Sequence, residues 1–258
     1  MADRVLLCAK QHNFQDVVAL AHRYKLGVEV QTFAYPQVLE GDWKSLLDEY
    51  RIALHTLSGE IAMHGPFLDM ASGSPDPLIS QVVRHRVQQA LLIAAELGAH
   101  KVVFHANFIA SIHNPEYRID WTKRQIEFWS SLAEEAWNKG LVIALENMWE
   151  FAPDIIGDVL RKLNLPGLRA CVDVGHAHLF SDVPFSCWLQ NLNSYIVHVH
   201  INNNSGTVDE HHALSNGVLN YPEILALIRQ LPHSPTLALE VDRVSDMEQS
   251  FALLDLPE

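Results

Sequence analysis

The 258-residue sequence is poor in cysteine and contains only Cys8, Cys171 and Cys187. Their odd number and wide spacing do not form a disulfide framework, and such sparse cysteines are typical of proteins kept in a reducing compartment. The CxxC spacing of thiolate zinc sites is also missing, which disfavours a metal centre built on cysteine. We therefore expect a cytoplasmic protein without disulfide bonds.

Long apolar runs and an excess of basic residues are missing as well. No run of about 18 apolar residues occurs, so no transmembrane helix is expected. The N-terminal stretch MADRVLLCAKQ does not resemble a signal peptide. Lys and Arg number 18 against 31 Asp and Glu, which gives a net charge of -13. Because an acidic surface repels phosphate backbones, neither nucleic acid nor a membrane is the expected partner.

What the sequence does contain is a repeated alternation of short apolar runs with longer amphipathic segments. The runs are rich in Val, Ile and Leu, as in parallel strands covered by helices on both sides. Strands are predicted at 4–9, 27–31, 61–65, 101–106, 141–147, 169–174, 195–202 and 236–241. Helices are predicted at 13–26, 40–58, 77–98, 121–139, 153–163, 183–193, 221–231 and 244–254, with Asn13 and Asp154 as cap or first-turn residues.

Eight strand–helix units in 258 residues predict an α/β fold, a single-domain (β/α)₈ TIM barrel over residues 1–258. A doubly wound open sheet is the alternative. It would normally carry a glycine-rich turn after the first strand, and here that turn reads CAKQHNFQ. The longer loops 66–76, 107–120 and 203–220 follow the third, fourth and seventh strands, so in a barrel they would lie at its catalytic mouth.

Side chains of the metal-ligand type stand at the predicted carboxyl ends of these strands. A lone histidine in a strand is more often a packed or surface residue, but these residues share one end of the barrel. Buried together without compensation they would be costly, and a divalent cation supplies that compensation. The candidates are His64, His105, Glu146, Asp173, His176, His200 and Glu240, with Asp209 and His211 in the loop after the seventh strand.

Other histidines are weaker candidates. His198 shares the inward face of His200 one layer deeper, so we expect it to support or pack rather than to bind metal. His178 and His212 neighbour candidates, and His113 could contact substrate or solvent. The remaining histidines are expected away from the mouth: His12, His22, His55, His85, His100 and His233.

The order of these motifs resembles the xylose-isomerase-like superfamily of TIM barrels, which includes endonuclease IV and sugar epimerases related to tagatose 3-epimerase and hydroxypyruvate isomerase. The resemblance runs from GVEVQ to LALEVD. Its most specific parts are CVDVGHAH and HVHINNNSGTVDEHHALSNGVLNY. It implies a divalent metal cofactor, and imidazole with carboxylate ligands suits zinc, manganese, cobalt or iron.

The resemblance implies two alternative metal sites. In the epimerases one metal is held by four side chains, which here match Glu146, Asp173, His200 and Glu240. The first and last of these would also form the catalytic acid/base pair. In endonuclease IV three zinc ions are held by nine side chains, and all nine candidates match those by type and order. One to three ions are therefore compatible with the sequence.

The sequence also departs from the two patterns. After His211 it reads Ser215-Asn216-Gly217 where a glycine-acid-glycine turn is usual. No Arg occurs between His200 and Ile224, where epimerases often carry one that binds substrate hydroxyls. The loop GPFLDMASGSPDP has no Lys or Arg, so the basic DNA-binding loops of endonuclease IV are not evident.

We rank a sugar isomerase or epimerase first, acting on a small carbohydrate or its phosphate. The metal would chelate a carbonyl and an adjacent hydroxyl, and Glu146 and Glu240 would move the proton. His176 would bind a hydroxyl, and Trp149 and Phe67 would cover the apolar face of the sugar, unless they merely pack. A multi-zinc phosphoester hydrolase ranks second, and a non-catalytic binding barrel has little support. A homo-oligomer is expected by analogy with the epimerases.

Overall fold

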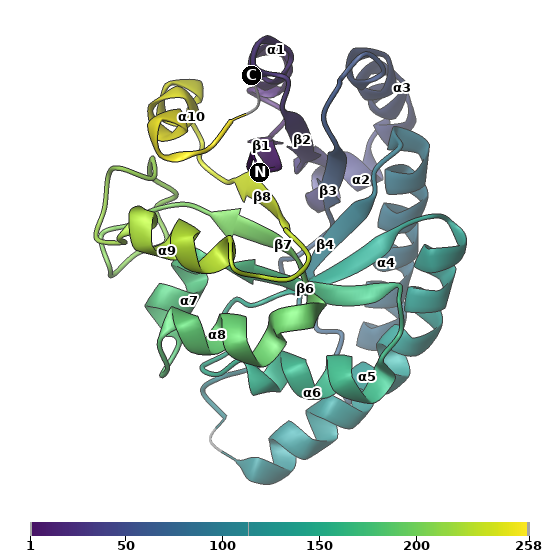
Figure 1. The fold of residues 1–258 in the computed structure, drawn as a ribbon. Coiled ribbons are helices and arrows are strands. Elements are labelled where there is room, and N and C mark those ends of the chain that lie inside the picture. The colour runs from purple at the N-terminus through teal and green to yellow at the C-terminus, as the bar shows by residue number, and fades with distance from the viewer. Residues whose placement is uncertain (1, 113, 257–258) are drawn as a thin grey trace.

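Eight parallel strands form a closed barrel in the computed structural model, which describes residues 2–112 and 114–256. His113 lies outside the described residues. The strands follow one another around the barrel in chain order, and β8 closes it against β1 (Figure 1). They are β1 Val5–Ala9, β2 Gly27–Val30, β3 Ile61–His64, β4 Lys101–His105, β5 Val142–Glu146, β6 Leu168–Asp173, β7 Ile196–Ile201 and β8 Thr236–Leu239. The predicted (β/α)₈ barrel and all eight strands are confirmed. The extent of the domain, 1–258, stays a prediction.

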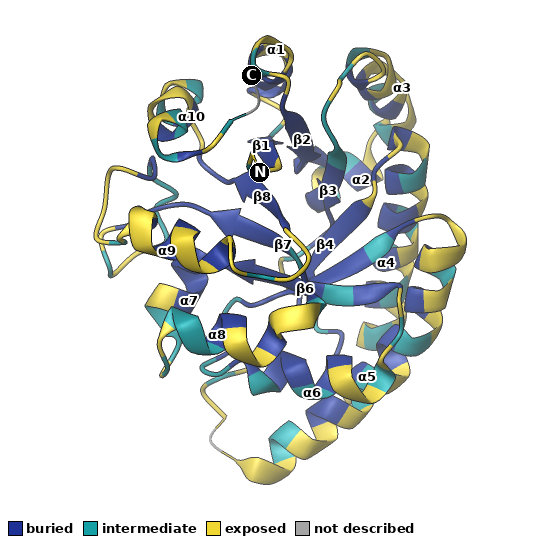
Figure 2. Cartoon of the chain, viewed as in Figure 1, coloured by how far each residue is buried: buried dark blue, intermediate teal, exposed yellow. Residues whose placement is uncertain are grey.

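Helices surround the barrel and turn their buried faces inward, while their outer faces are exposed (Figure 2). Within the described residues none is long and apolar enough to cross a membrane. The helices are α1 Phe14–Tyr24, α2 Pro36–Glu40, α3 Trp43–Leu54, α4 Pro77–Leu97, α5 Pro115–Asn138, α6 Asp154–Leu163, α7 Val174–Phe180, α8 Phe185–Leu192, α9 Tyr221–Ile228 and α10 Val244–Ser250. Short 3₁₀ turns lie at Thr32–Ala34, Asn193–Tyr195 and Phe251–Leu253.

Small side chains fill the inside of the barrel, whereas the large apolar ones pack between strands and helices. Two inner clusters are formed by Leu6, Cys8, Ala62 and Ala238, and by Val103, Ala144 and Cys171. Because successive strand residues point to opposite faces, the residue two places further along each strand also points inward. On β3, β4, β5, β6 and β8 that residue is His64, His105, Glu146, Asp173 and Glu240. The alternation thus delivers the candidate ligands to one end of the interior.

Local details depart from the expectations in three places. The helix predicted at 40–58 is α3, which spans only Trp43–Leu54, and α2 at Pro36–Glu40 was not predicted. The backbone is extended at Gly41 between the two helices, and the Asp42 side chain then accepts a hydrogen bond from Ser45 N. Helix α5 begins at Pro115, inside the predicted loop, with Asn114 as its capping side chain. Asn13 stands at the N-cap position of α1, as expected, but its side chain does not cap the helix, because its Oδ1 accepts from Lys10 N instead. Asp154 is a first-turn residue of α6, as expected.

Candidate metal centre

The predicted ligand-type side chains converge on Glu146, which lies at the end of β5. His64 Nε2 and His105 Nε2 lie 3.2 and 3.1 Å from Glu146 Oε2. His200 Nδ1 lies 3.0 Å from the other oxygen, Oε1. The carboxylate therefore has imidazoles from three strands around it, each within reach of a shared cation.

Four of the predicted ligands form the tightest group. One donor atom each from Glu146, Asp173, His200 and Glu240 lies within 4.8 Å of the other three, and all four residues are buried. Two carboxylates and an imidazole from neighbouring strands, with a further carboxylate from β8, are a donor set that suits zinc, manganese, cobalt or iron.

A second group stands beside the first, toward the solvent. His176 Nε2 and His211 Nε2 each lie 3.2 Å from an oxygen of Asp209. His176 also connects the second group to the first, since its Nδ1 is 3.4 Å from Glu146 Oε1. All nine predicted ligands thus lie in one continuous cluster at the barrel mouth.

The hydrogen bonds of this cluster fit a cation. His64 Nδ1 and His176 Nδ1 lie 2.8 and 2.9 Å from the backbone carbonyls of Gly65 and Asn147, so each Nδ1 carries the hydrogen. Their Nε2 lone pairs then face carboxylate oxygens, an arrangement that a positive charge between them stabilises. Glu240 Oε2 and Asp209 Oδ1 are buried and have no well-aligned hydrogen-bond donor within the described residues, although His200 Nδ1 and His211 Nε2, respectively, lie 3.2 Å away. A bound dication would satisfy both oxygens.

Burial and the interactions between charged side chains raise some pKa values in the cluster and lower others. Burial, helped by the charges of Glu146 and Glu240, raises the pKa of Asp173 to about 6. Burial also opposes ionisation of Glu146 and Glu240, but the surrounding imidazoles, His200 foremost, together more than offset it and hold both pKa values well below the usual range. The pKa of His211 rises to about 9 because the Glu240 and Asp209 carboxylates outweigh its burial. The cluster therefore attracts positive charge, as protons or as a dication.

Polar residues that sequence reasoning missed hold the cluster in place. Asn147 Oδ1 accepts from Asp173 N at 2.9 Å, and Asn202 Nδ2 donates to Asp173 Oδ2 at 2.9 Å. A Cβ on Gly175 would lie 2.2 Å from Asn202 Oδ1, so only glycine permits this close approach. On β2 and just after it, Glu29 and Gln31 also point into the barrel and reach His200 and Glu240. A charged residue inside the apolar run GVEVQ was the signal that could have revealed Glu29.

A cavity of about 260 Å³ opens above the cluster. Six of the nine candidates line it, while Glu146, Asp173 and His200 lie beneath its floor. The predicted substrate-contact residues His176, Phe67 and Trp149 all line it, together with Lys10 and Tyr35, which were not predicted. The Phe67 ring packs against His64 and His105, with centroids 5.4 and 5.2 Å apart, and Trp149 is 45% exposed.

The other histidines lie where they were expected. His198 is fully buried beneath His200, His178 is exposed, and His212 pairs with Asn203 in an isolated bridge. The six histidines expected away from the mouth are exposed on the surface: His12, His22, His55, His85, His100 and His233.

Comparison with known proteins agrees with this architecture. The family model described as xylose isomerase-like TIM barrel matches residues 19–255. An uncharacterized protein of Methanocaldococcus jannaschii is 26% identical over 202 residues, which cover 76% of this chain and 69% of that protein.

Solved structures give the same result. A protein from Thermus thermophilus, soaked with ZnCl₂, is 30% identical with a TM-score of 0.81, covering 96% of this chain and 95% of that one. A D-tagatose 3-epimerase-like protein is 21% identical with a TM-score of 0.80, covering 97% and 95%. The second likeness is one of fold alone.

Proposed function

This chain belongs to the xylose isomerase-like TIM barrel family, and on that premise we propose that it is a metal-dependent sugar isomerase or epimerase. The observation that carries the proposal is the group of Glu146, Asp173, His200 and Glu240, whose donor atoms lie within 4.8 Å of one another. It combines a site for one divalent cation with two carboxylates next to an open cavity.

These four side chains would hold the metal, which we propose to be zinc, manganese or cobalt. When bound, such a cation supplies Lewis acidity that polarises a sugar carbonyl and makes the neighbouring C–H bond more acidic. The remaining chemistry belongs to side chains. Glu146 and Glu240 are both held as carboxylates by the imidazoles around them, His200 foremost, so either can take a proton from carbon while the other returns one.

The cavity suits a small polyhydroxylated molecule. Its volume of about 260 Å³ is slightly below the usual range of ligand pockets, which begins at roughly 300 Å³, so it suits one small sugar rather than a larger ligand. His176 and His211 line it as donors for hydroxyl groups, and Phe67 and Trp149 offer apolar ring faces. These contacts support a carbohydrate as the substrate.

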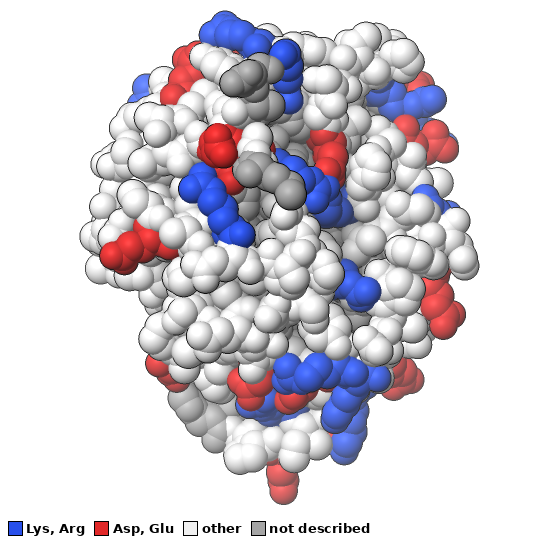
Figure 3. Space-filling view, viewed as in Figure 1, with Lys and Arg blue, Asp and Glu red and all other residues white. Residues whose placement is uncertain are grey.

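Charge at the mouth favours a neutral sugar over a phosphorylated one or a nucleic acid. Besides its histidines, the described part of the cavity is lined by one basic side chain, Lys10, whose Nζ is already paired with Asp242. Figure 3 shows the opposite, amino-terminal end of the barrel, where Lys and Arg side chains stand beside Asp and Glu side chains and form no continuous basic surface over the described residues. With a net charge of -13, the protein has little to attract a phosphate backbone.

The cellular setting is proposed on the same basis. Cys8, Cys171 and Cys187 are all free, as expected for a cytoplasmic protein. A homo-oligomer stays a prediction.

A multi-metal phosphoester hydrolase is the second candidate, and the His176, Asp209 and His211 group favours it. Further cations held there would lie next to the first group, as in hydrolases whose clustered metals activate water. The variant Asp209→Ala separates the candidates. It should lower the metal content and activity severely if this group holds a metal, and only mildly if one metal sits on Glu146, Asp173, His200 and Glu240.

The deciding experiment is metal content per chain, measured by plasma mass spectrometry on protein purified without chelator or an affinity-tag metal. We expect about one divalent ion per chain, which would be a zinc, manganese or cobalt ion held by the four proposed ligands. The same protein, incubated with ketoses and aldoses in heavy water, should exchange a carbon-bound hydrogen. About three zinc ions per chain, with phosphoester hydrolysis and no exchange, would favour the second candidate instead.

A further inference from the structure

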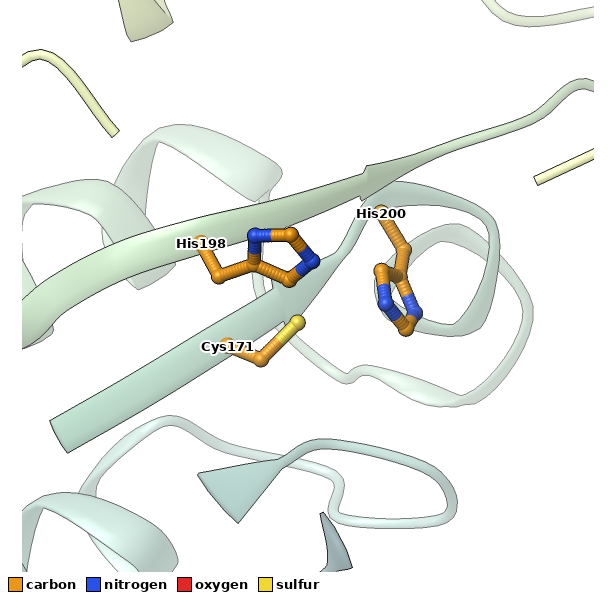
Figure 4. A group of neighbouring side chains, drawn as sticks. All are labelled: Cys171, His198 and His200. Carbon is orange, nitrogen blue, oxygen red and sulfur yellow. The ribbon is translucent and has the colours of Figure 1, made fainter. Parts of the chain in front are cut away.

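A second layer of polar side chains lies inside the barrel, beneath the proposed metal site. Figure 4 shows His198 and His200 of β7 side by side with Cys171 of β6, whose sulfur points toward the imidazoles. Their donor atoms lie within 4.8 Å of one another, and all three residues are buried. The spacing alone would suit a thiophilic metal.

The hydrogen bonds of His198 assign this layer a different role. Its Nε2 lies 2.7 Å from Glu29 Oε2 and its Nδ1 lies 2.5 Å from Thr236 Oγ1. Both ring nitrogens are therefore engaged by the protein. The layer is a hydrogen-bonded support, and its centre is the fully buried carboxylate of Glu29.

Glu29 accepts hydrogen bonds from both histidines of β7. Its Oε2 lies 2.7 Å from His198 Nε2 and 3.2 Å from His200 Nε2. Its Oε1 accepts from Gln31 Nε2 at 3.4 Å and faces Cys8 Sγ at 3.7 Å. A carboxylate only accepts, so Nε2 of His200 donates its hydrogen to Glu29, and Nδ1 is the nitrogen left to face the proposed metal site. That Nδ1 lies 3.0 Å from Glu146 Oε1 and 3.2 Å from Glu240 Oε2.

We propose that Glu29 is a positioning residue that presents Nδ1 of His200 to the divalent cation. It fixes the tautomer and the ring orientation of His200 from behind, and its negative charge makes the imidazole a stronger ligand. Strand β2 also supports the other side of the site, since Gln31 Nε2 donates to Glu240 Oε1 at 2.6 Å. The inference rests on the metal site of the proposed function, but not on its sugar chemistry.

A zinc titration of three variants tests the assignment. Zn²⁺ affinity is measured by competition with a chromophoric chelator. Glu29→Leu removes the acceptor at nearly constant size, and Glu29→Gln keeps the shape but removes the charge. Thr236→Val is the matched control, because it removes a hydrogen bond from His198 in the same buried layer without touching His200. We expect both Glu29 variants to bind zinc roughly 10- to 100-fold more weakly than the wild type, as for outer partners of metal-bound histidine. Thr236→Val should stay within about twofold.

Nitrogen NMR of the zinc-bound wild type supplies an independent readout, because it reports which ring nitrogen of His200 keeps its hydrogen when the cation is present. We expect the hydrogen on Nε2 in the wild type and in Thr236→Val. A hydrogen on Nδ1 in the wild type overturns the proposal, and so does a folded Glu29→Gln that binds zinc as tightly as the control. Weakened zinc binding in a protein that never exchanges sugar hydrogens would uphold this inference and overturn the proposed function. Normal sugar turnover with unchanged zinc affinity in both Glu29 variants would overturn this inference and uphold the proposed function.

Discussion

Glu60 shows how a single side chain ties the amino-terminal end of the barrel together. It pairs with Arg4 and with Lys101, whose Nζ lies 2.8 Å away and whose side chain is largely buried. Burial opposes ionisation of Glu60, but hydrogen bonds and charge from these two cations outweigh it and lower its pKa from 4.5 to about 2. The carboxylate is therefore more stable in the folded chain than in the unfolded one.

We predict that Glu60→Gln lowers the free energy of unfolding at neutral pH by about 1–3 kcal/mol, because it leaves Lys101 without its partner. A group with a depressed pKa stabilises fully above its unfolded value of 4.5, and the effect is lost as the pH falls toward about 2. Urea unfolding at several pH values measures this. The gap between wild type and variant should shrink below pH 4.5. Glu248→Gln, at the exposed pair with Arg23, is the control and should change far less.

Of the two proposed acid/base carboxylates, Glu240 is the more open to substrate, since it lines the cavity and Glu146 does not. If it moves a proton in the reaction, Glu240→Gln should lower turnover by roughly 10²- to 10⁴-fold. The amide keeps the shape and an oxygen ligand, so the protein should remain folded. Initial rates and circular dichroism of the purified variant check both statements. Full activity in Glu240→Gln would remove this residue from the catalytic role, and the same test applies to Glu146.

The candidate ligands could be predicted from the sequence because most are polar residues at or just after the end of an apolar strand, and Asp209 and His211 follow in the loop after one of these strands. The residues behind them could not. Glu29 and Gln31 belong to a strand whose end offers no histidine, and their role depends on facing β7 and β8 across the barrel interior. Lys10 and Tyr35 line the cavity from loops whose paths are set by tertiary packing. Sequence periodicity contains no information on such contacts.

At the scale of elements, the start of helix α4 depends on the residue just before it. Asp76 precedes α4, and its Oδ1 accepts from Leu78 N at 2.8 Å, with Pro77 at the first helical position. We predict that Asp76→Ala destabilises the protein by about 1 kcal/mol, because an amide at the helix start loses its acceptor. Thermal unfolding should show a melting temperature lower by roughly 2–4 °C. Asp76→Asn keeps an acceptor oxygen and should behave like the wild type, and an equal loss in both variants would exclude capping as the cause.

Strands were easier to predict than helix boundaries for a physical reason. A buried parallel strand needs a continuous apolar run, and that run is visible in the sequence. Helix α7 was missed because it starts directly at the strand end, where Asp173 caps it by accepting from His176 N at 2.5 Å. The same carboxylate serves the proposed metal site, so helix start and site share one residue. Local patterns cannot separate two such roles.

At the scale of the whole molecule, the site joins strands that lie far apart along the chain. The cluster takes side chains from β3 through β8, and closure of the barrel brings β8 beside β1. The order of eight strand–helix units predicted this closure, because parallel strands with short connections follow one another around a barrel. A ligand held by the cluster would therefore contact residues from β3 through β8 at once, and it would bind the chain only in the folded state.

We accordingly predict that divalent metal stabilises the entire barrel. A ligand that binds only the folded chain adds about 2.7 kcal/mol at 100 times its dissociation constant, which raises the melting temperature by roughly 5–10 °C. Thermal unfolding in a chelator and in increasing free Zn²⁺ measures it, and the increase should continue logarithmically with concentration. Mg²⁺ is the matched control, because it prefers oxygen ligands and the cluster is rich in imidazole. In Glu240→Gln the gain should shrink, since one ligand loses its charge. Equal melting temperatures with chelator and with zinc would mean that the clustered carboxylates and imidazoles balance one another by proton sharing alone, and that the barrel mouth holds no metal.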